Sequence, residues 1–149
     1  MKKFEILEHK ADLKIRVFGK TKEELFSNAL LAMAESMKAE KIDKEAKREI
    51  KIKSPDLPAL LVDFLNEVLY LTQVNKEIYT DVKFKKNSVP SANSGRVPSA
   101  GSGQVELEGE LFGQKVERFG EDIKAVTYHS LNVHQKKDDT WEATVLFDI

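Results

Sequence analysis

Acidic groups stand near both ends of this sequence, and the last two residues form the first candidate site. Asp148 is followed only by Ile149, so we expect the Asp148 side chain and the α-carboxylate of Ile149 to lie one residue apart on an ordered strand. Two neighbouring anionic groups repel each other unless a cation or hydrogen-bond donors offset their charge. The pair is therefore a reason to look for a third acidic group elsewhere in the chain.

The segment 8–12 (EHKAD) is the strongest source of that third group. Its Glu8, His9 and Asp12 place two acids and an imidazole close together, at the expected junction of two strands. If the last strand pairs with the strand that begins at Asp12, then Asp12, Asp148 and Ile149 converge on one hard divalent cation, because such ions prefer oxygen ligands. The sequence alone does not establish that pairing.

The histidines support a weaker hypothesis. His129 could act as a general base, but a histidine that is hydrogen-bonded near the start of a strand is the favoured interpretation. The sequence contains no zinc pattern, dinucleotide fingerprint, phosphate loop or nucleophile elbow. We therefore expect no catalytic residue. Two alternatives stay open: a small metal-dependent phosphoester hydrolase with His9 or His129 as its base, and a chaperone-like RNA-binding module.

Composition narrows the class of protein. A chain of 149 residues with 41% hydrophobic content is long enough for one core without disulfides or structural metals. The formal net charge is -1, so no overall field attracts nucleic acid or an anionic membrane. The absence of cysteine excludes thiol nucleophiles and disulfides. With no signal peptide or membrane span expected, the sequence predicts a cytoplasmic protein without a membrane partner.

Two helices are predicted from apolar periodicity. Thr21 followed three residues later by Glu24 is a capping box, which predicts a helix from Lys22 to about Lys38. The run 57–74 has an apolar arc wider than one stripe and should be the central helix. Its interruptions by Asp63 and Glu67 argue against a membrane helix.

Alternation of apolar and polar residues predicts the strands. They are expected at 4–6, 12–17, 49–53, 78–85, 105–116 and 140–149. Residues 41–48 should form a charged connection, 112–114 a turn, and 122–133 a short helical turn that passes into a strand near Leu131. Asp138 and Asp139 should form the hairpin turn before the last strand.

These elements predict an α+β fold, with one mostly antiparallel β-sheet and two long helices packed on one of its faces. We expect a single domain over residues 1–149. Within it, 87–103 (NSVPSANSGRVPSAGSG) is almost entirely Ser, Gly, Pro and Ala, which predicts a flexible loop or an inserted linker.

Four motifs in order carry a resemblance to a known family. They are 8–12 (EHKAD), 60–71 (LLVDFLNEVLYL), 123–129 (IKAVTYH) and 141–149 (WEATVLFDI). Together they resemble the archease family, the small accessory proteins of RtcB-type tRNA-splicing RNA ligases. The resemblance covers the whole chain except 87–103.

The resemblance implies an activator rather than an enzyme. It implies that the protein promotes guanylylation and repeated turnover of an RtcB-type RNA ligase, broadens the nucleotides that the ligase accepts, and meets RNA only through the ligase. It also implies a divalent metal ion, calcium-like or alternatively Mg or Mn, bound by Asp12, Asp148 and Ile149. Glu8, His9 and His129 are expected as supporting residues.

Two lysines depart from the family pattern in the first motif. Lys10 stands where the family usually has threonine, and Lys14 where it usually has glycine. Both add positive charge near the site, so we expect them either to weaken the affinity for the cation or to replace part of its role.

Overall fold

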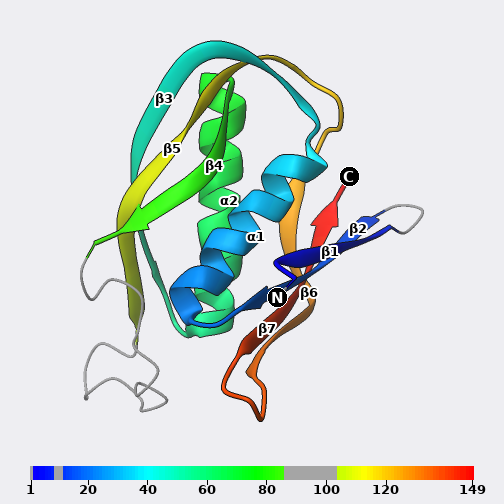
Figure 1. Cartoon of the computed structure of the whole chain (residues 1–149), viewed down its shortest axis with the longest axis vertical. Helices are drawn as coiled ribbons and strands as arrows, with labels where there is room; N and C mark the ends of the chain where they lie inside the picture. Colours follow the sequence, from blue (N-terminus) through cyan, green and yellow to red (C-terminus); the bar gives the residue numbers. More distant parts are fainter. Residues whose placement is uncertain (1, 9–11, 86–103) are drawn as a thin grey trace.

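The computed structural model describes residues 2–8, 12–85 and 104–149, and it arranges them as two antiparallel sheets with two helices between them (Figure 1). The four-stranded sheet has the order β1-β2-β7-β6, and the three-stranded sheet the order β3-β5-β4. The elements are β1 (Phe4–Glu8), β2 (Asp12–Gly19), α1 (Lys22–Ser36), β3 (Ala39–Ser54), α2 (Leu57–Asn75), β4 (Glu77–Phe84), β5 (Val105–Phe119), β6 (Ala125–Gln135) and β7 (Trp141–Asp148). His9, Lys10 and the expected loop or linker at 87–103 lie outside the described residues.

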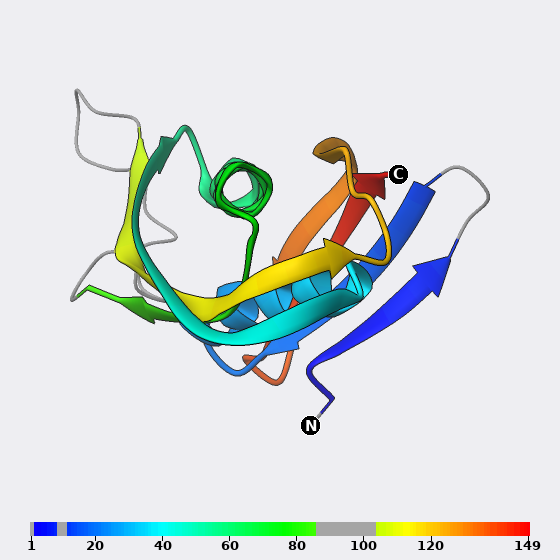
Figure 2. The ribbon, with the colours of Figure 1, turned by 90° about the horizontal axis from the view of Figure 1, so that it is seen from above.

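The α+β class is confirmed, but the strands form two sheets where the sequence predicted one. Both helices contact both sheets: α1 packs against β2 and β4, and α2 against β6 and β3 (Figure 2). A helix covered from two sides needs an apolar surface wider than one stripe. This requirement explains the broad apolar arc on α2, where Leu60, Leu61, Phe64 and Leu65 are all fully buried.

Helix α2 has the length and hydropathy of a membrane span, and among the described residues it is the one helix that does. Its apolar side chains nevertheless pack against the two sheets, so within this fold α2 is a core helix. The helix begins at Leu57, where the Asp56 side chain accepts a hydrogen bond of 2.9 Å from the Ala59 amide. Such a cap satisfies an amide that would otherwise lack a partner.

Helix α1 begins where the capping box predicts. The Thr21 hydroxyl accepts a 3.1 Å hydrogen bond from the Glu24 amide, and the Glu24 side chain accepts one from the Lys20 amide. The other end of α1 is closed by the β5–β6 connection, because the amides of Gly120 and Glu121 donate to the carbonyl oxygen of Met37. The connection is therefore fixed against the last turn of α1.

The inner face of the four-stranded sheet forms one wall of the core. Leu13, Ile15 and Val17 alternate inward along β2, and Val145 and Phe147 do the same along β7. Complete burial of side chains of this size contributes roughly 1.5–3 kcal/mol each. A shift of register by one residue would move all of them to solvent, so this face holds the two strands in a defined register.

Two predicted connections are wrong because they lie inside strands, and one predicted helical turn is not present. Residues 41–48 belong to β3, whose exposed charges suit the edge strand of a sheet. Residues 112–114 lie within the continuous strand β5, where Gly113 leaves room for the backbone of Ile78: a Cβ atom on Gly113 would lie 1.8 Å from the Ile78 carbonyl oxygen. The expected helical turn after Asp122 is absent from the described connection, and β6 begins directly at Ala125.

The predicted hairpin turn before the last strand is confirmed. Asp138 and Asp139 lie between β6 and β7, and Asp139 has a positive φ of 69°. The Asp138 carboxylate accepts hydrogen bonds from both the amide and the hydroxyl of Thr140. These bonds stabilise its charged form and lower the pKa of Asp138.

A buried carboxylate ties the strands of the three-stranded sheet together. Glu77 on β4 is 1% exposed and accepts two hydrogen bonds of 2.9 Å from Arg48 on β3. Lys115 on β5 lies 2.8 Å from the same carboxylate, and the Tyr79 hydroxyl donates to it at 2.5 Å. The hydrogen bonds from Arg48 outweigh burial and lower the pKa of Glu77 to about 2.

We predict that this network makes stability sensitive to acid. Because the pKa of Glu77 is lowered on folding, its contribution is present above the ordinary pKa of about 4.5 and is lost as the pH falls toward about 2. In urea unfolding, Glu77→Gln should therefore be less stable than the wild type at pH 7, and the difference should shrink between pH 5 and pH 2. A difference that stays constant with pH would contradict this account.

Candidate functional site

The first and last motifs meet through the pairing of β2 with β7. The two strands are antiparallel, and Asp12 lies directly opposite Asp148. Residues directly opposite each other in antiparallel strands point to the same face, with Cβ atoms about 4.5–5.5 Å apart. The pairing that the sequence left open is therefore present, and it brings these two predicted site residues side by side.

The carboxylates belong to the outer face of the four-stranded sheet. The neighbours of Asp12 in sequence alternate, with Leu13 and Ile15 buried against the helices and Lys14 on the side of Asp12. This agrees with the expectation that Asp12 starts a strand on its more polar face. Lys14 lies opposite Leu146, the next pair along the same face, so its side chain starts from the same face as the acidic pair.

Asp12 is the more enclosed member of the pair. Its residue is partly buried, and its Oδ1 atom is inaccessible to solvent and has no hydrogen-bond partner among the described residues. A buried polar atom without a partner costs about 1–3 kcal/mol, and more when the group is charged. Asp148 is exposed, so the pair combines one shielded oxygen with one carboxylate that a partner or an ion can reach.

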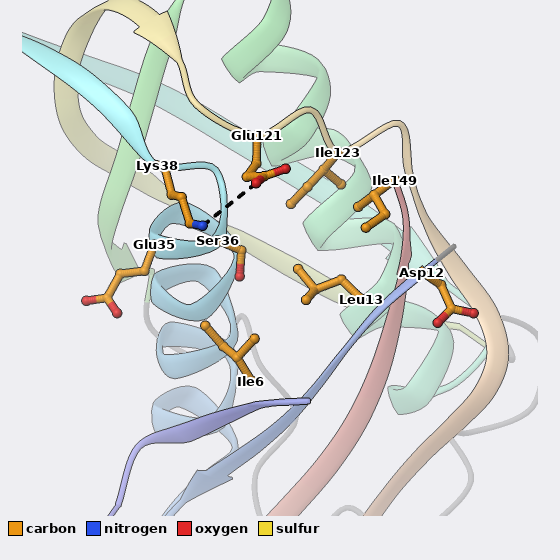
Figure 3. A pocket seen from close by; sticks show the side chains of 9 residues that line it. All are labelled: Ile6, Asp12, Leu13, Glu35, Ser36, Lys38, Glu121, Ile123 and Ile149. Atoms are coloured by element: carbon orange, nitrogen blue, oxygen red, sulfur yellow. Dashed lines mark ion pairs between the residues drawn. The ribbon is translucent and has the colours of Figure 1, made fainter. Parts of the chain in front are cut away.

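Ile149 anchors the end of β7 next to Asp12. Its side chain packs against the core and points with Leu13 and Ile123 toward a pocket that Asp12 also lines (Figure 3). The carbonyl oxygen of Asp148 accepts a 2.7 Å hydrogen bond from the Lys124 amide, which holds the end of β7 against the β5–β6 connection. The three residues predicted as cation ligands, Asp12, Asp148 and Ile149, therefore occupy one corner of the molecule.

The carboxylate oxygens of Asp12 and Asp148 are the type of ligand that a hard cation prefers. Two carboxylates do not complete the coordination shell of such an ion. The described residues contain no cluster of three His, Cys, Asp or Glu side chains that could hold a metal ion. Asp12 and Asp148 supply two carboxylates, and the partnerless Oδ1 of Asp12 is the type of atom that an ion would satisfy. A calcium-like ion takes six to eight oxygen ligands, so the others must come from backbone, water or a partner.

Of the supporting residues, Glu8 and His129 are placed less favourably than the acidic pair. Glu8 ends β1 opposite Leu13, one position from Asp12 along the pairing, and His9 lies outside the described residues. His129 is exposed, in a segment of β6 that bulges away from its pairing with β7, and its amide donates to the Thr127 hydroxyl. The residue of β6 opposite Asp148 is Ala125, so the register does not bring His129 to the carboxylates.

The two middle motifs also meet, and this contact braces the strand beside β7. Asn66 of α2 donates to the carbonyl oxygen of Val126 and accepts from its amide, both at 2.9 Å. Gln73 donates to the carbonyl oxygen of Ile123 at 3.0 Å. Strand β6 is an edge strand of its sheet, so Asn66 satisfies backbone groups of Val126 on an edge that no other described strand covers.

A third polar contact joins the same elements. The Tyr128 hydroxyl donates to the Asp63 carboxylate, which also accepts from the Ser54 hydroxyl at 2.5 Å. The hydrogen bond to Asp63 and, next, burial raise the pKa of Tyr128 to about 12. The sequence patterns did not indicate roles for Asp63, Asn66 or Tyr128. The available signal was the presence of polar residues inside an otherwise apolar helix motif.

Comparisons with known proteins give a consistent result over the whole length. The model of the Archease protein family (MTH1598/TM1083) matches residues 4–149. A protein archease of Methanosarcina barkeri is 39% identical over 149 residues, which covers 99% of this chain and 97% of that protein. One from Pyrococcus furiosus is 31% identical, with both chains covered completely.

Solved structures agree with the fold. The solution structure of Methanobacterium thermoautotrophicum protein 1598 matches with a TM-score of 0.71 and 29% identity, and both chains are covered completely. The crystal structure of a Thermotoga maritima archease, described as a possible chaperone, matches with a TM-score of 0.66 and 22% identity, covering 96% of this chain and 94% of that chain. At that identity the second likeness supports the fold alone.

We predict that the acidic pair lowers stability in the absence of cations. Like charges directly opposite each other on neighbouring strands repel, so Asp148→Asn should raise the free energy of unfolding by about 0.2–1 kcal/mol at low ionic strength. In 1 M salt, where the Debye length falls to about 3 Å, the gain should shrink. The measurement is urea unfolding in the presence of a chelator.

The matched control is Asp43→Asn, which removes the same charge from an exposed position on β3. This control should show no increase in the free energy of unfolding that disappears in 1 M salt. A stability of Asp148→Asn equal to or below that of the wild type at low salt would contradict repulsion between the two carboxylates.

Proposed function

The chain belongs to the archease family, and on this premise we propose that it is an activator of an RtcB-type tRNA-splicing RNA ligase that acts through the Asp12–Asp148 pair. In this role the protein is an accessory factor and not an enzyme. It promotes guanylylation of the ligase and its repeated turnover, and it broadens the nucleotides that the ligase accepts.

The observation that carries the proposal is the register of β2 and β7. It places Asp12 opposite Asp148 on a sheet face that neither helix covers, at the same corner as Ile149. A carboxylate pair in this position is available to a second protein, whereas a pair between the sheets would not be. The two middle motifs support the arrangement, because the hydrogen bonds of Asn66 hold β6 next to β7.

The proposed chemistry follows from the donors. Asp12 and Asp148, with the α-carboxylate of Ile149, would hold a divalent cation, calcium-like or alternatively Mg or Mn, and a bound cation supplies electrostatic stabilisation of charge on a phosphoryl group. The residues of this chain hold and orient oxygen ligands at a solvent-facing corner. The nucleophile and the nucleotide pocket belong to the ligase in this proposal.

The placement of His129 argues against that residue as the base of the hydrolase alternative, whereas His9, the other candidate base, lies outside the described residues. Hydrolysis of a phosphoester at the same carboxylates would need a base beside them. His129 is exposed in the bulge of β6, while Ala125 is the residue opposite Asp148. A chaperone-like RNA-binding role also has no specific support, because the face that carries Lys14 also carries the acidic pair, and the overall net charge is -1.

We predict that both carboxylates are required for activation. In a ligase guanylylation assay with GTP, Mn²⁺ and catalytic amounts of activator, Asp12→Ala and Asp148→Ala should each reduce the stimulation about 10- to 100-fold, the usual loss for groups that support a metal site. The control Asp43→Ala should stimulate like the wild type, because Asp43 lies on β3 in the other sheet.

Circular dichroism and urea unfolding should show that all three variants are folded. Full stimulation by both Asp12→Ala and Asp148→Ala would exclude the acidic pair as the functional site. Phosphoester turnover by the isolated wild type that both variants lack would instead support the hydrolase alternative.

A further inference from the structure

Strand β1 is an edge of the four-stranded sheet, and no described strand lies beyond it (Figure 2). The Phe18 amide donates a 2.9 Å hydrogen bond to the carbonyl oxygen of Lys3, which makes these two residues a hydrogen-bonded pair. Such pairs alternate along antiparallel strands, so the backbone N–H and C=O groups of Phe4 and Ile6 point away from β2. Among the described residues, no hydrogen bond occupies these groups.

The opposite edge of the same sheet shows how such groups can be blocked. On β6 the N–H and C=O groups of Val126 also point away from the sheet, and Asn66 bonds to both. The strand is also irregular between Thr127 and Asn132. Bulges and covering side chains protect an edge against pairing with another strand. Addition of a strand at Val126 is therefore prevented.

The edges of the three-stranded sheet are protected as well. Strand β3 carries many exposed charges and shifts its register between Glu40 and Glu45. Strand β4 has a register shift between Tyr79 and Asp81, and the Asp81 carboxylate accepts a 2.9 Å hydrogen bond from the Val82 amide. Among the described edge strands, β1 alone pairs in continuous register and carries no such side-chain cap. It is therefore the edge most open to strand addition.

An aliphatic hollow lies beside this edge. Four aliphatic side chains line it, those of Ile6, Leu13, Ile123 and Ile149 (Figure 3). The Asp12 and Glu35 carboxylates point away from the hollow, and Glu121 is paired with Lys38. Its volume of about 180 Å³ is below the roughly 300–1,000 Å³ of common small-molecule sites. The hollow therefore suits one apolar side chain, and Ile6, which is 40% exposed, leaves its β1 side accessible.

We infer that β1 receives an extended segment of the ligase, which adds a further strand to this sheet and places an aliphatic side chain at the hollow. Residues directly opposite each other on neighbouring strands point to the same face, so the residue of the segment opposite Ile6 starts on the side of the hollow. In strand addition, backbone hydrogen bonds give affinity, and pockets for alternate side chains give specificity.

The size and position of β1 favour the ligase over a second copy of this chain. Strand β1 has five residues and spans roughly 17 Å. Two paired strands of this length supply less than the roughly 1,200–2,000 Å² that a stable interface buries. Asp12 lines the hollow and lies opposite Asp148, so a partner at the acidic pair is next to β1. This docking contact rests on the proposed function and adds a second contact to it.

The first experiment measures affinity for the ligase. Ile6→Pro removes the amide that points to the open edge and keeps the amides of Glu5 and Leu7, which bond to β2. The matched control is Ile42→Pro, because Ile42 is 43% exposed and lies on the edge strand β3. Ile6→Pro should bind roughly tenfold more weakly, since a carbonyl of the partner loses its donor and an apolar contact is lost. The control should bind like the wild type.

A second variant covers the case in which Ile6→Pro is shown to be unfolded by circular dichroism. Ile6→Lys keeps the amide and places a charge at the hollow, which is how natural edge strands prevent pairing. It should also bind the ligase roughly tenfold more weakly than the wild type.

The second experiment measures hydrogen exchange of single amides in the free protein and in its complex with the ligase. The amides of Glu5 and Leu7 bond to β2, so they should exchange slowly in both states. The amides of Phe4 and Ile6 should exchange rapidly in the free protein and at least about tenfold more slowly in the complex. A contact made by side chains alone would not produce this alternation.

The outcomes separate this docking contact from the proposed function. If the ligase is activated while Phe4 and Ile6 exchange as in the free protein, the contact at β1 is wrong and the proposed function stands. Binding by both Ile6 variants as tight as by Ile42→Pro would also overturn it. Protection of these amides without activation would support the contact and contradict the proposed function. Protection in the isolated protein, with a dimer in sedimentation, would make a second copy the occupant and overturn the assignment to the ligase.

Discussion

The antiparallel pairing of β2 with β7 is the interaction on which the rest of this structure depends. It joins the beginning of the chain to its end and sets Asp12 opposite Asp148. The same register turns Ile15, Val17, Val145 and Phe147 toward the helices, where their burial stabilises the pairing. One constraint therefore serves both stability and the site, since the residues that alternate with the buried ones carry the carboxylates.

The remaining elements support this pairing from the side. Helix α2 contacts β6, and the Asn66 amide completes the hydrogen bonds of Val126 on the open edge of that strand. The end of α1 is held by the amides of Gly120 and Glu121, and Lys124 in the same connection binds the backbone of Asp148. The corner that carries the acidic pair is thus held by both helices and by the β5–β6 connection, and this frame keeps Asp12 and Asp148 opposite each other.

Much of the fold could be predicted from the sequence where periodicity was strong. The capping box at Thr21, the wide apolar arc of α2 and the alternation of the last strand each identified an element correctly. The errors arose where tertiary contacts decide. Charged residues 41–48 resemble a loop but form part of an edge strand, and Gly113 resembles a turn residue but allows close approach of Ile78. The division of the strands into two sheets depends on contacts between distant segments, which local patterns do not encode.

The candidate site was predictable in part. Residue types singled out Asp12 and Asp148, but only the register of two strands far apart in sequence shows that they are neighbours. The contacts of Asp63 with Tyr128 and of Asn66 with Val126 could not be derived, because they join residues 65 and 60 positions apart. His129 was considered as a supporting residue, and the bulge of β6 keeps it from the pairing with β7.

The most direct test of the central claim is a double-mutant cycle on divalent-cation affinity. Calorimetric titrations with Ca²⁺ and Mn²⁺ would compare the wild type with Asp12→Asn, Asp148→Asn and the double variant. If the cross-strand carboxylates hold one ion together, each single variant should lose nearly as much affinity as the double variant, because residues that act as a unit are not additive. Wild-type affinity in both single variants, or losses that simply add, would contradict a shared site.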